Sequence, residues 1–333
     1  MKVSVVGAGS WGTAISALLA RKGHDVFTWA RDSQVAEKIN QTNQNPRYLT
    51  KLMLPKNITA SSDLAEVMSG SSLLVLAIPT HAMRSLMKQI RDHLSPEMPI
   101  LSLAKGLEVE SKLRMSEVIK EETSERFHSN IAVLSGPNHA EEVAEEIPSA
   151  TVIAAFEKEV ALYLQSIFMS SYFRVYTSPD LVGVELGGAT KNVVAIAVGI
   201  SDGLGFGDNT KAALLTRGLA EMTRFGAALG ASVHTFSGLS GLGDLVVTCT
   251  SRHSRNRALG ELIGKGETLS DYKAGSSMVA EGANCCLALK ELSADAGVVM
   301  PINSAVVEVL YNKRLPLECV QDLMSRDARM EDE

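Results

Sequence analysis

A glycine-rich turn directly after the first apolar run constrains the fold of this chain more than any other feature. The run Lys2–Val6 is short and mostly β-branched, and the sequence GAGSWG follows it at residues 7–12. Apolar residues then recur at helical spacing as far as Gly23, which is suited to end a helix. A G-x-G-x-x-G spacing between a strand and a helix is typical of a dinucleotide-binding turn.

Each glycine of this turn has a separate physical purpose. Gly7 permits the tight turn, and Gly9 lets a pyrophosphate approach the backbone. Gly12 lets the helix pack closely on the strand, and the helix N-terminus favours the negative charge of the ligand. The same spacing also fits a strand-to-helix turn that binds no ligand, and the motif alone leaves both interpretations open.

The N-terminal segment has a second property, which is the absence of charge. No residue from Val3 to Ala20 is charged, and this length is close to that of a membrane span. Glycines interrupt the segment, with a β-type run before them and a helical pattern after them. We therefore expect a buried strand, turn and helix, with no integral membrane segment and no secretory signal.

Apolar runs alternate with helical stretches through the first half of the chain. Further strand candidates are Asp25–Trp29, Leu73–Ile78, Ile100–Ala104, Ile131–Leu134, Thr151–Ala155 and Phe173–Tyr176. This alternation predicts an α/β fold with an N-terminal Rossmann-type, doubly wound and mostly parallel sheet. Beyond residue 180 the apolar spacing becomes three and four. We therefore expect a domain boundary near residue 180, with a Rossmann-type domain before it and a helical domain after it.

Composition restricts the partners and the compartment of the chain. The net charge of −6 argues against a nucleic-acid partner, and it requires any anionic ligand to be held by a local basic cluster. The four cysteines form no C-x-x-C pair, and the seven histidines show no metal-ligand spacing. We expect reduced thiols, a cytoplasmic location and no metal site.

The end of the second expected strand bears on the choice between NAD and NADP. The position where an acidic residue would bind the ribose 2′-hydroxyl is Ala30, and Arg31 and Asp32 follow it. Arg31 can pair with a 2′-phosphate or stack on adenine, which favours NADPH. The alternative is that Arg31 and Asp32 are ordinary solvated loop charges.

Polar residues follow two further expected strands. Lys105 comes directly after the strand that ends at Ala104, and an ammonium group there suits a phosphate or a carbonyl oxygen. The sequence SGPNHA at residues 135–140 ends the next strand, and Gly136 shapes a backbone donor site. A helix cap and a surface lysine would explain the same residues without a ligand.

Lys191 lies in an otherwise apolar segment of small residues. Burial disfavours the ammonium form and can bring a lysine into the range needed for proton transfer. Alternatively, the side chain can extend along an apolar surface and reach solvent.

The sequence SRHSRNR at residues 251–257 is the local basic cluster that an acidic chain requires. Arg252, Arg255 and Arg257, with Ser254 and Asn256 between them, can present guanidinium groups and neutral donors to one phosphate. An exposed basic loop is one alternative. A nucleic-acid patch is another, although it lacks interleaved aromatic residues.

In their order along the chain, these segments resemble the bacterial NAD(P)-dependent sn-glycerol-3-phosphate dehydrogenases. The most specific stretch is GATKNVVAIAVGISDGLGFGDNTKAALLTRG at residues 188–218, and GLSGLGDL and SRHSRNR add independent matches. The resemblance covers nearly the whole chain. It implies interconversion of dihydroxyacetone phosphate and sn-glycerol 3-phosphate with NADP or NAD, for glycerophospholipid biosynthesis. It also implies an NAD(P)-binding Rossmann-type domain over residues 1–180, an all-helical substrate-binding and catalytic domain over residues 181–333, and a homodimer.

Carried over residue by residue, the resemblance makes Lys191 the catalytic acid/base. The substrate positions that it implies are Lys105, Gly136, Asn138, Lys191, Asp244, Ser254, Arg255 and Asn256. The cofactor positions, with the glycines of the turn, are Gly7, Gly9, Ser10, Trp11, Gly12, Arg31, Tyr48, Lys105, Ala140, Arg255, Val279 and Glu281. Asn138 departs from the small hydroxyl or alanine that the family more often has, although its amide can still donate a hydrogen bond.

Two other functions start from the same motifs. A β-hydroxyacid or 6-phosphogluconate-type dehydrogenase shares the Rossmann start and the helical second half, but acts on carboxylates. A nucleotide-sensing interaction protein would bind NAD(P)H without oxidising it. Such a sensor needs neither Lys191 nor the arginine cluster. A substrate panel that compares dihydroxyacetone phosphate with hydroxy acids separates the glycerol-3-phosphate enzyme from the carboxylate enzyme.

Overall fold

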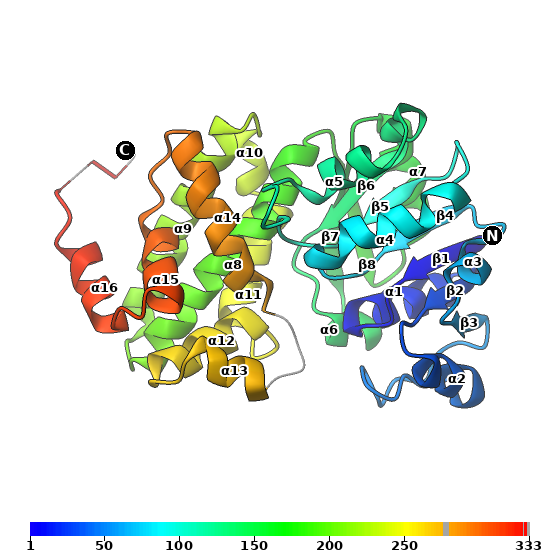
Figure 1. Cartoon of the computed structure of the whole chain (residues 1–333), viewed down its shortest axis with the longest axis horizontal. Coiled ribbons are helices and arrows are strands. Elements are labelled where there is room, and N and C mark those ends of the chain that lie inside the picture. The colour runs from blue at the N-terminus through cyan, green and yellow to red at the C-terminus, as the bar shows by residue number, and fades with distance from the viewer. Residues whose placement is uncertain (276–279, 329, 332–333) are drawn as a thin grey trace.

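A computed structural model describes residues 1–275, 280–328 and 330–331 of the 333-residue chain. Strands and helices alternate as far as residue 178, and helices alone follow (Figure 1). The strands are β1 Lys2–Val6, β2 Asp25–Trp29, β3 Ile58–Ser61, β4 Leu73–Leu76, β5 Ile100–Ser102, β6 Ile131–Ser135, β7 Ser149–Ala155 and β8 Phe173–Ser178.

The helices fall into two groups. Those of the strand-containing half are α1 Ser10–Arg21, α2 Ser33–Thr42, α3 Leu64–Met68, α4 Met83–Ile90, α5 Met115–Glu122, α6 Ala140–Ala144 and α7 Lys158–Phe168. Those of the helical half are α8 Leu181–Gly203, α9 Asp208–Ala228, α10 Val233–Phe236, α11 Asp244–Thr250, α12 Arg255–Gly264, α13 Leu269–Gly275, α14 Glu281–Asp295, α15 Pro301–Tyr311 and α16 Pro316–Met324.

The strands form one eight-stranded sheet in the order β3-β2-β1-β4-β5-β6-β7-β8. All neighbouring pairs are parallel except β6 and β7, which are antiparallel. The order reverses at β1, which lies between β2 and β4, and this is the position where open α/β sheets bind ligands. The predicted fold class, a doubly wound Rossmann-type sheet followed by helices, is confirmed.

Strand β3 is the one strand that the sequence patterns did not identify. It spans Ile58–Ser61, and only Ile58 and Ala60 are buried core residues. An edge strand of four residues, three of them small or polar, gives too weak an alternation to be recognised. The other strands occur as expected, with ends that differ by at most two residues.

Helix α8 is the central element of the helical half. It is apolar on every side, and nearly all its residues from Leu181 to Ser201 are buried. By length and composition this helix is the one in the described chain that could cross a membrane, but 89% of its most apolar window is buried inside the structure. Figure 1 shows it surrounded by the other helices, as a core helix that is apolar all round must be.

Glycines allow α8 and α12 to approach until their backbones touch. A Cβ atom on Gly199 of α8 would lie 2.1 Å from the carbonyl oxygen of Arg257, and one on Gly260 of α12 would lie 2.1 Å from that of Ile196. Larger residues would separate the helices. The close crossing holds the start of α12 beside the middle of α8, where Lys191 lies.

The two glycine-rich segments of the helical half have different structures. Glycine-rich sequences around residues 203–207 and 238–243 predict two loops, and residues 204–207 do form a loop between α8 and α9. Residues 239–243, also expected to be a loop, instead form a short π-helix that leads into α11. A Cβ on Gly241 would lie 2.1 Å from the carbonyl oxygen of Phe236, so this residue makes the tight winding possible. The π-helix directs Asp244, at the start of α11, toward α8.

Candidate functional site

The turn between β1 and α1 has the geometry of an open anion site. Gly7 has φ +120°, and a Cβ there would lie 2.4 Å from the carbonyl oxygen of Ala77 on the neighbouring strand end. A Cβ on Gly12 would lie 1.8 Å from the carbonyl oxygen of Gly7. Gly9, by contrast, has no atom within 4 Å of a Cβ position, and no side chain caps the helix there. The first backbone N–H groups of α1 therefore face open space.

Trp11 and Ala140 meet beside this turn. Both belong to a small apolar cluster that also includes Ala14 of α1 and Leu49. The indole Nε1 of Trp11 is buried and has no partner among the described residues. Tyr48, half-buried and next to Leu49, donates its backbone N–H to the side-chain oxygen of Asn45. The turn, the loop around residue 48 and α6 therefore enclose one end of the sheet.

The end of β2 presents cations rather than a free carboxylate. Arg31 is exposed, and Ala30 before it is buried. Asp32 caps α2 by accepting the backbone N–H of Gln34 at 3.0 Å, and it also forms an ion pair with Arg47. The carboxylate of Asp32 therefore already has partners, and Arg31 before it is an exposed cation.

These features fit a dinucleotide. The helix N-terminus is uncapped, the space beside Gly9 is empty, and the Trp11 indole lacks a partner. An anionic ligand at a helix N-terminus satisfies the free N–H groups and interacts favourably with the helix dipole.

One contact joins the cofactor side of the sheet to the helical half. The hydroxyl of Thr80, just after β4, donates to Oε2 of Glu281 at 2.9 Å. A Cβ on Gly106 would lie 3.0 Å from the Thr80 methyl group and 3.8 Å from Oε2 of Glu281. Glu281, the first residue of α14, thus lies at the junction with its carboxylate next to the strand ends. Val279, another expected cofactor residue, lies outside the described residues.

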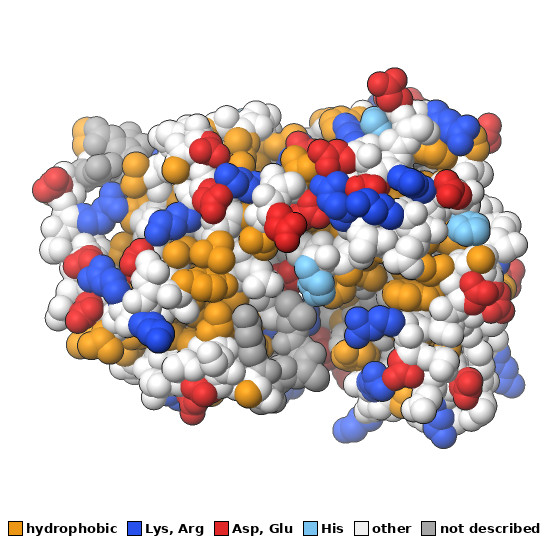
Figure 2. Space-filling model, in the orientation of Figure 1, with side chains coloured by type: hydrophobic (Ala, Val, Ile, Leu, Met, Phe, Trp, Pro, Cys, Tyr) orange, Lys and Arg blue, Asp and Glu red, His pale blue; other side chains and the backbone are white. Residues whose placement is uncertain are grey.

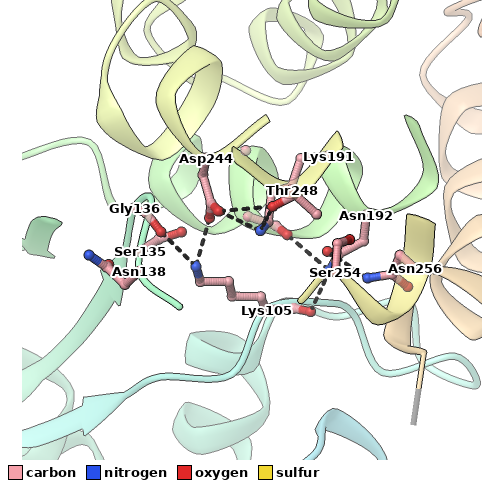
Figure 3. Close-up of polar contacts among 12 residues, drawn as sticks. Lys105, Ser135, Gly136, Asn138, Lys191, Asn192, Asp244, Thr248, Ser254 and Asn256 are labelled. Atoms are coloured by element: carbon pink, nitrogen blue, oxygen red, sulfur yellow. Dashed lines mark hydrogen bonds and ion pairs between the residues drawn. The ribbon is translucent and has the colours of Figure 1, made fainter. Parts of the chain in front are cut away.

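Two lysines, one from each half of the molecule, share a single carboxylate (Figure 3). Lys191 Nζ donates to Oδ1 of Asp244 at 2.5 Å, and Lys105 Nζ donates to Oδ2 at 2.7 Å. Lys191 also donates to the Thr248 hydroxyl at 2.6 Å, and Lys105 donates to the carbonyl oxygen of Gly136 at 2.9 Å. The network therefore connects the carboxyl ends of β5 and β6 to the core helix.

Burial controls the charges in this network. Lys191 is 5% exposed and Asp244 is 2% exposed. Burial, with help from the nearby Lys105, lowers the pKa of Lys191 to about 8, and Asp244 opposes this shift. For Asp244, burial alone would raise the pKa, but the two ammonium groups outweigh it and lower the pKa. The carboxylate stays ionised, while the Lys191 amine can gain or lose a proton near neutral pH.

The turn after β6 has unused polar atoms close to Lys105. The Asn138 amide donates to the carbonyl oxygen of Ala150 at 2.8 Å, while its Oδ1 is buried without a partner. The Ser135 hydroxyl is likewise buried and unpartnered within the described chain. A Cβ on Gly136 would lie 2.9 Å from Cα of Thr151, so only glycine lets this turn approach β7. Unsatisfied buried polar atoms are rare, and a polar ligand would explain them.

The start of α12 supplies the third part of the site. Ser254 caps the helix and accepts the backbone N–H of Arg257 at 3.2 Å, and Arg255 is exposed at the first turn. The Asn256 amide donates to Oδ1 of Asn192 at 3.0 Å. Asn256 therefore contacts the residue that follows Lys191, and Arg255 begins the same helical turn.

Arg257 departs from the expectation that three arginines converge. Its Nε donates to Oδ2 of Asp202 at 2.8 Å, on the C-terminal part of α8. Residues two apart on a helix point in different directions, so Arg255 and Arg257 do not share one ligand. Arg252 is exposed, with its Nε 3.4 Å from Nε2 of His253.

Sequence reasoning missed Asn192 and Thr248. Asn192 follows Lys191 directly and contacts Asn256, and Thr248 lies one helical turn after Asp244 and contacts Lys191. Thr248 could in principle have been predicted from Asp244, because residues four apart share a helix face. That relation required knowing that Asp244 begins a helix, which a glycine-rich segment did not reveal.

Two further features lie outside this network. The described residues contain no group of three or more His, Cys, Asp or Glu side chains that could hold a metal ion. A separate apolar groove of 610 Å³ lies between α9, α15 and α16. Its lining includes none of the residues of the lysine network. Burial raises the pKa of Glu221 in this groove to about 7, against the effect of the backbone N–H groups of Ile302 and Asn303 that it accepts.

Two family models match the chain over most of its length. Residues 2–161 match the model described as NAD-dependent glycerol-3-phosphate dehydrogenase N-terminus, and residues 180–321 match the model for the C-terminus of the same enzyme.

Individual relatives agree with these matches. The chain is 48% identical over 324 residues to the protein of Moorella thermoacetica named glycerol-3-phosphate dehydrogenase [NAD(P)+], covering 97% of this chain and 96% of that protein. It is 46% identical to the protein of the same name from Leptospira biflexa, covering 99% of each. The crystal structure of glycerol-3-phosphate dehydrogenase from Coxiella burnetii superimposes with a TM-score of 0.92 at 34% identity, covering 98% of this chain and 99% of that one.

Proposed function

The chain belongs to the NAD-dependent glycerol-3-phosphate dehydrogenase family, and from this premise we propose how its own residues carry the reaction. It is an NAD(P)-dependent oxidoreductase that interconverts dihydroxyacetone phosphate and sn-glycerol 3-phosphate, the backbone of glycerophospholipids. The observation that carries the residue assignments is the buried lysine at the junction of the two halves, held by one carboxylate beside unpartnered polar atoms.

Lys191 is the proton donor for reduction of the ketone. An ammonium group has three N–H donors, and Asp244 and Thr248 accept two of those on Lys191. The third is free to bond the carbonyl oxygen, where negative charge develops as the carbonyl carbon accepts a hydride. Lys191 then gives its proton to that oxygen, and the neutral amine regains one from solvent. In the reverse direction the neutral amine removes the proton from the hydroxyl group.

Asp244 and Lys105 position these groups. Asp244 fixes the Lys191 amine and keeps part of its positive charge in place, while Lys105 holds the other carboxylate oxygen. Because Lys105 also reaches the turn after β6, it links the substrate to the cofactor side of the sheet. Gly136 and Asn138 line the same turn and contact the substrate there.

The phosphate is bound at the start of α12. Arg255 supplies a guanidinium, and Ser254 and Asn256 supply neutral polar groups on the same turn. Binding energy from the phosphate places the ketone at the Lys191 amine, so a substrate without phosphate loses rate as well as affinity. Arg255→Ala therefore raises the KM for dihydroxyacetone phosphate.

The cofactor lies along the turn between β1 and α1. When bound, the nicotinamide supplies the hydride. Gly7, Gly9, Ser10, Trp11 and Gly12 form the pyrophosphate cradle. Other contacts come from Arg31, Tyr48, Lys105, Ala140, Arg255, Val279 and Glu281.

NADPH is the preferred cofactor. The support is the exposed Arg31 at the end of β2 and the engagement of the Asp32 carboxylate in a helix cap and an ion pair. A ribose 2′-phosphate needs cations there, whereas a 2′-hydroxyl needs a free carboxylate.

The experiment that tests the function is a spectrophotometric assay of the purified chain. NADPH and NADH oxidation are measured with dihydroxyacetone phosphate and with a panel of 2-oxo and 3-oxo acids. We expect turnover with the phosphate ester and at least about a hundredfold lower kcat/KM with the acids. Preference for an acid would contradict the proposal.

The division into residues 1–180 and 181–333 matches the change from strands to helices. Support comes from the end of β8 at Ser178, the start of α8 at Leu181, and a large apolar core in each half. A smaller cluster, which includes Val133 and Leu181, packs across the boundary. Residues 1–180 carry the dinucleotide-binding turn, and residues 181–333 carry the catalytic lysine and the phosphate site.

A second copy of the chain covers the groove between α9, α15 and α16. Val299 is 63% exposed and Met324 is 82% exposed, and both line this groove. Figure 2 shows hydrophobic side chains gathered over the helical half. An apolar surface of this kind marks an interaction site. We expect a homodimer by sedimentation, converted to monomer by Val299→Glu with Met324→Glu. The control Val233→Glu, on α10 outside the groove, remains a dimer.

A cytoplasmic location fits the cysteine chemistry. Cys249, Cys285, Cys286 and Cys319 are all free and buried. A reducing compartment keeps such thiols reduced. Fractionation of cells that express the tagged chain should recover the activity with the cytoplasm.

A further inference from the structure

Two histidines from opposite halves of the molecule face each other beside the lysine network. His139 lies in the turn between β6 and α6, and His253 lies in the segment between α11 and α12. Their ring centroids are 5.8 Å apart and their planes make an angle of 52°. Neither the Rossmann motif nor the roles proposed for Lys191 and Asp244 require a histidine at either position.

His139 has an unused hydrogen-bonding atom on the site side. Its Nε2 is buried and has no partner among the described residues. The neighbouring Asn138 Oδ1 and Ser135 hydroxyl are also buried and unpartnered. Three unsatisfied polar atoms within five residues, next to two lysines, are the signature of a polar ligand that completes the hydrogen bonds.

His253 connects this cluster to the phosphate site. It directly precedes Ser254 and Arg255, which cap and begin α12. It is exposed, and its Nε2 lies 3.4 Å from Nε of Arg252. The imidazole therefore lies between the arginine segment and His139, on the open side of the junction.

We propose that His139 and His253 form a substrate-binding pair that contacts the phosphate end of dihydroxyacetone phosphate from the two halves of the enzyme. This inference rests on the proposed phosphate site at Arg255. A single phosphate at the open edge of the two rings accepts a hydrogen bond from each imidazole, which satisfies His139 Nε2 and ties the turn after β6 to the start of α12. The pair adds affinity for the anionic end of the substrate and takes no part in proton transfer to the ketone.

The charges around His139 give the pair a distinctive pH dependence. Burial and then Lys191 lower the pKa of His139, with Lys105 acting in the same direction, while Glu141 and Asp244 oppose the shift. The free enzyme therefore holds His139 neutral at pH 7. A bound phosphate dianion adds negative charge beside the ring, so binding favours the imidazolium form and takes up a proton. This contribution to affinity weakens as pH rises.

The test compares the purified wild-type enzyme with His139→Leu, His139→Gln and His253→Leu, using dihydroxyacetone phosphate and NADPH. We expect each leucine variant to raise the KM for the substrate about tenfold, with kcat and the KM for NADPH changed less than about threefold. The inhibition constant of inorganic phosphate, measured as a competitor of the substrate, should rise in parallel.

His139→Gln separates hydrogen bonding from titration. Its amide restores a donor, so most of the substrate affinity returns at pH 8.5, where wild-type His139 is neutral. At pH 6 it stays weaker than wild type, because glutamine cannot take up the proton. The ratio of its KM to the wild-type KM is therefore larger at pH 6 than at pH 8.5. Comparison at each pH cancels the titration of the phosphate ester itself.

His93→Gln on the surface of the strand-containing half is the matched control and should behave as wild type. If wild type turns over the substrate but His139→Leu and His253→Leu keep its KM and its phosphate inhibition constant, the pair is not a binding site. Should His139→Leu fail to fold, the exposed His253→Leu decides by the same measurements. Absence of wild-type turnover with dihydroxyacetone phosphate would instead refute the proposed function.

Discussion

The two halves of the molecule contribute different kinds of groups to the same site. The strand-containing half offers backbone and empty space, namely the uncapped start of α1, the open position beside Gly9 and the carbonyl oxygen of Gly136. The helical half offers charged side chains whose state depends on burial, above all Lys191 and Asp244. One half is suited to hold a ligand of fixed shape, and the other is suited to move a proton.

This difference shows why the two halves tolerate change differently. A backbone cradle depends on a few glycines next to one another in the chain, and substitution there alters binding or local packing. The proton-transfer group depends on residues from β5, α8 and α11 that meet only in the folded state. Changes in it alter charge and pKa as well as shape.

Removing the catalytic amine should have the largest effect on the reaction and little on the cradle. Lys191→Ala deletes the proton donor, so we expect kcat to fall by about 10²–10⁴-fold. Binding of NADPH, measured by fluorescence titration, should change less than about twofold because the cradle lies in the other half. Near-normal turnover would remove Lys191 from the mechanism, and lost cofactor affinity would show that the halves are not independent.

Two glycine-to-alanine substitutions should separate cofactor binding from folding. In Gly260→Ala the new Cβ would lie 2.1 Å from the carbonyl oxygen of Ile196, so we expect a loss of about 1–3 kcal/mol in the free energy of unfolding. In Gly9→Ala the new Cβ meets no protein atom within 4 Å, so stability should stay within about 0.5 kcal/mol of wild type.

Cofactor binding should be affected in the opposite order, with the larger effect in Gly9→Ala. The methyl group of Gly9→Ala blocks the close approach of a pyrophosphate, which should raise the KM for NADPH about tenfold or more. Urea unfolding and steady-state kinetics on both variants measure the two effects. Equal effects on stability would contradict the contrast between an open glycine and a packed one.

The pH profile tests the buried amine directly. The proton donor must be charged, so kcat for ketone reduction should be level below about pH 8 and fall about tenfold per pH unit above it. In the oxidation direction the neutral amine is needed, so the rate should rise with pH up to about 8 and then level. Asp244 raises the pKa of Lys191, and Asp244→Asn should therefore move both midpoints to lower pH. A midpoint that moves upward would reverse the assigned electrostatics.

Cofactor preference should show the smallest change. Arg31→Ala removes an exposed cation next to the ribose site, and we expect NADPH to bind about fivefold more weakly with NADH changed less than twofold. Arg47→Ala is measured beside it, because Arg47 is the arginine that pairs with Asp32. An equal loss for both cofactors would indicate that Arg31 contacts the adenine and not a phosphate.

Much of the fold and part of the site could be predicted because their signals are local. The turn at residues 7–12 lies between a strand and a helix as expected, and the apolar stripe of α4 is buried at all its four positions, Met83, Leu86, Met87 and Ile90. Strand β3 was missed because four residues with two polar members carry little pattern. Arg257 was grouped with Arg255 because the chain suggested a loop, whereas a helix turns them apart.

The sequence by itself determined the sheet, the cofactor turn and the family, because strand alternation, glycine spacing and long motifs are properties of neighbouring residues. Only the tertiary structure decided that Lys105, Lys191 and Asp244 share one buried network, that Thr248 and Asn192 complete it, and that His139 faces His253. The physical reason is that hydrogen bonds and pKa shifts depend on separation and burial in space. Residues far apart in the chain acquire both only when the helices pack against the sheet.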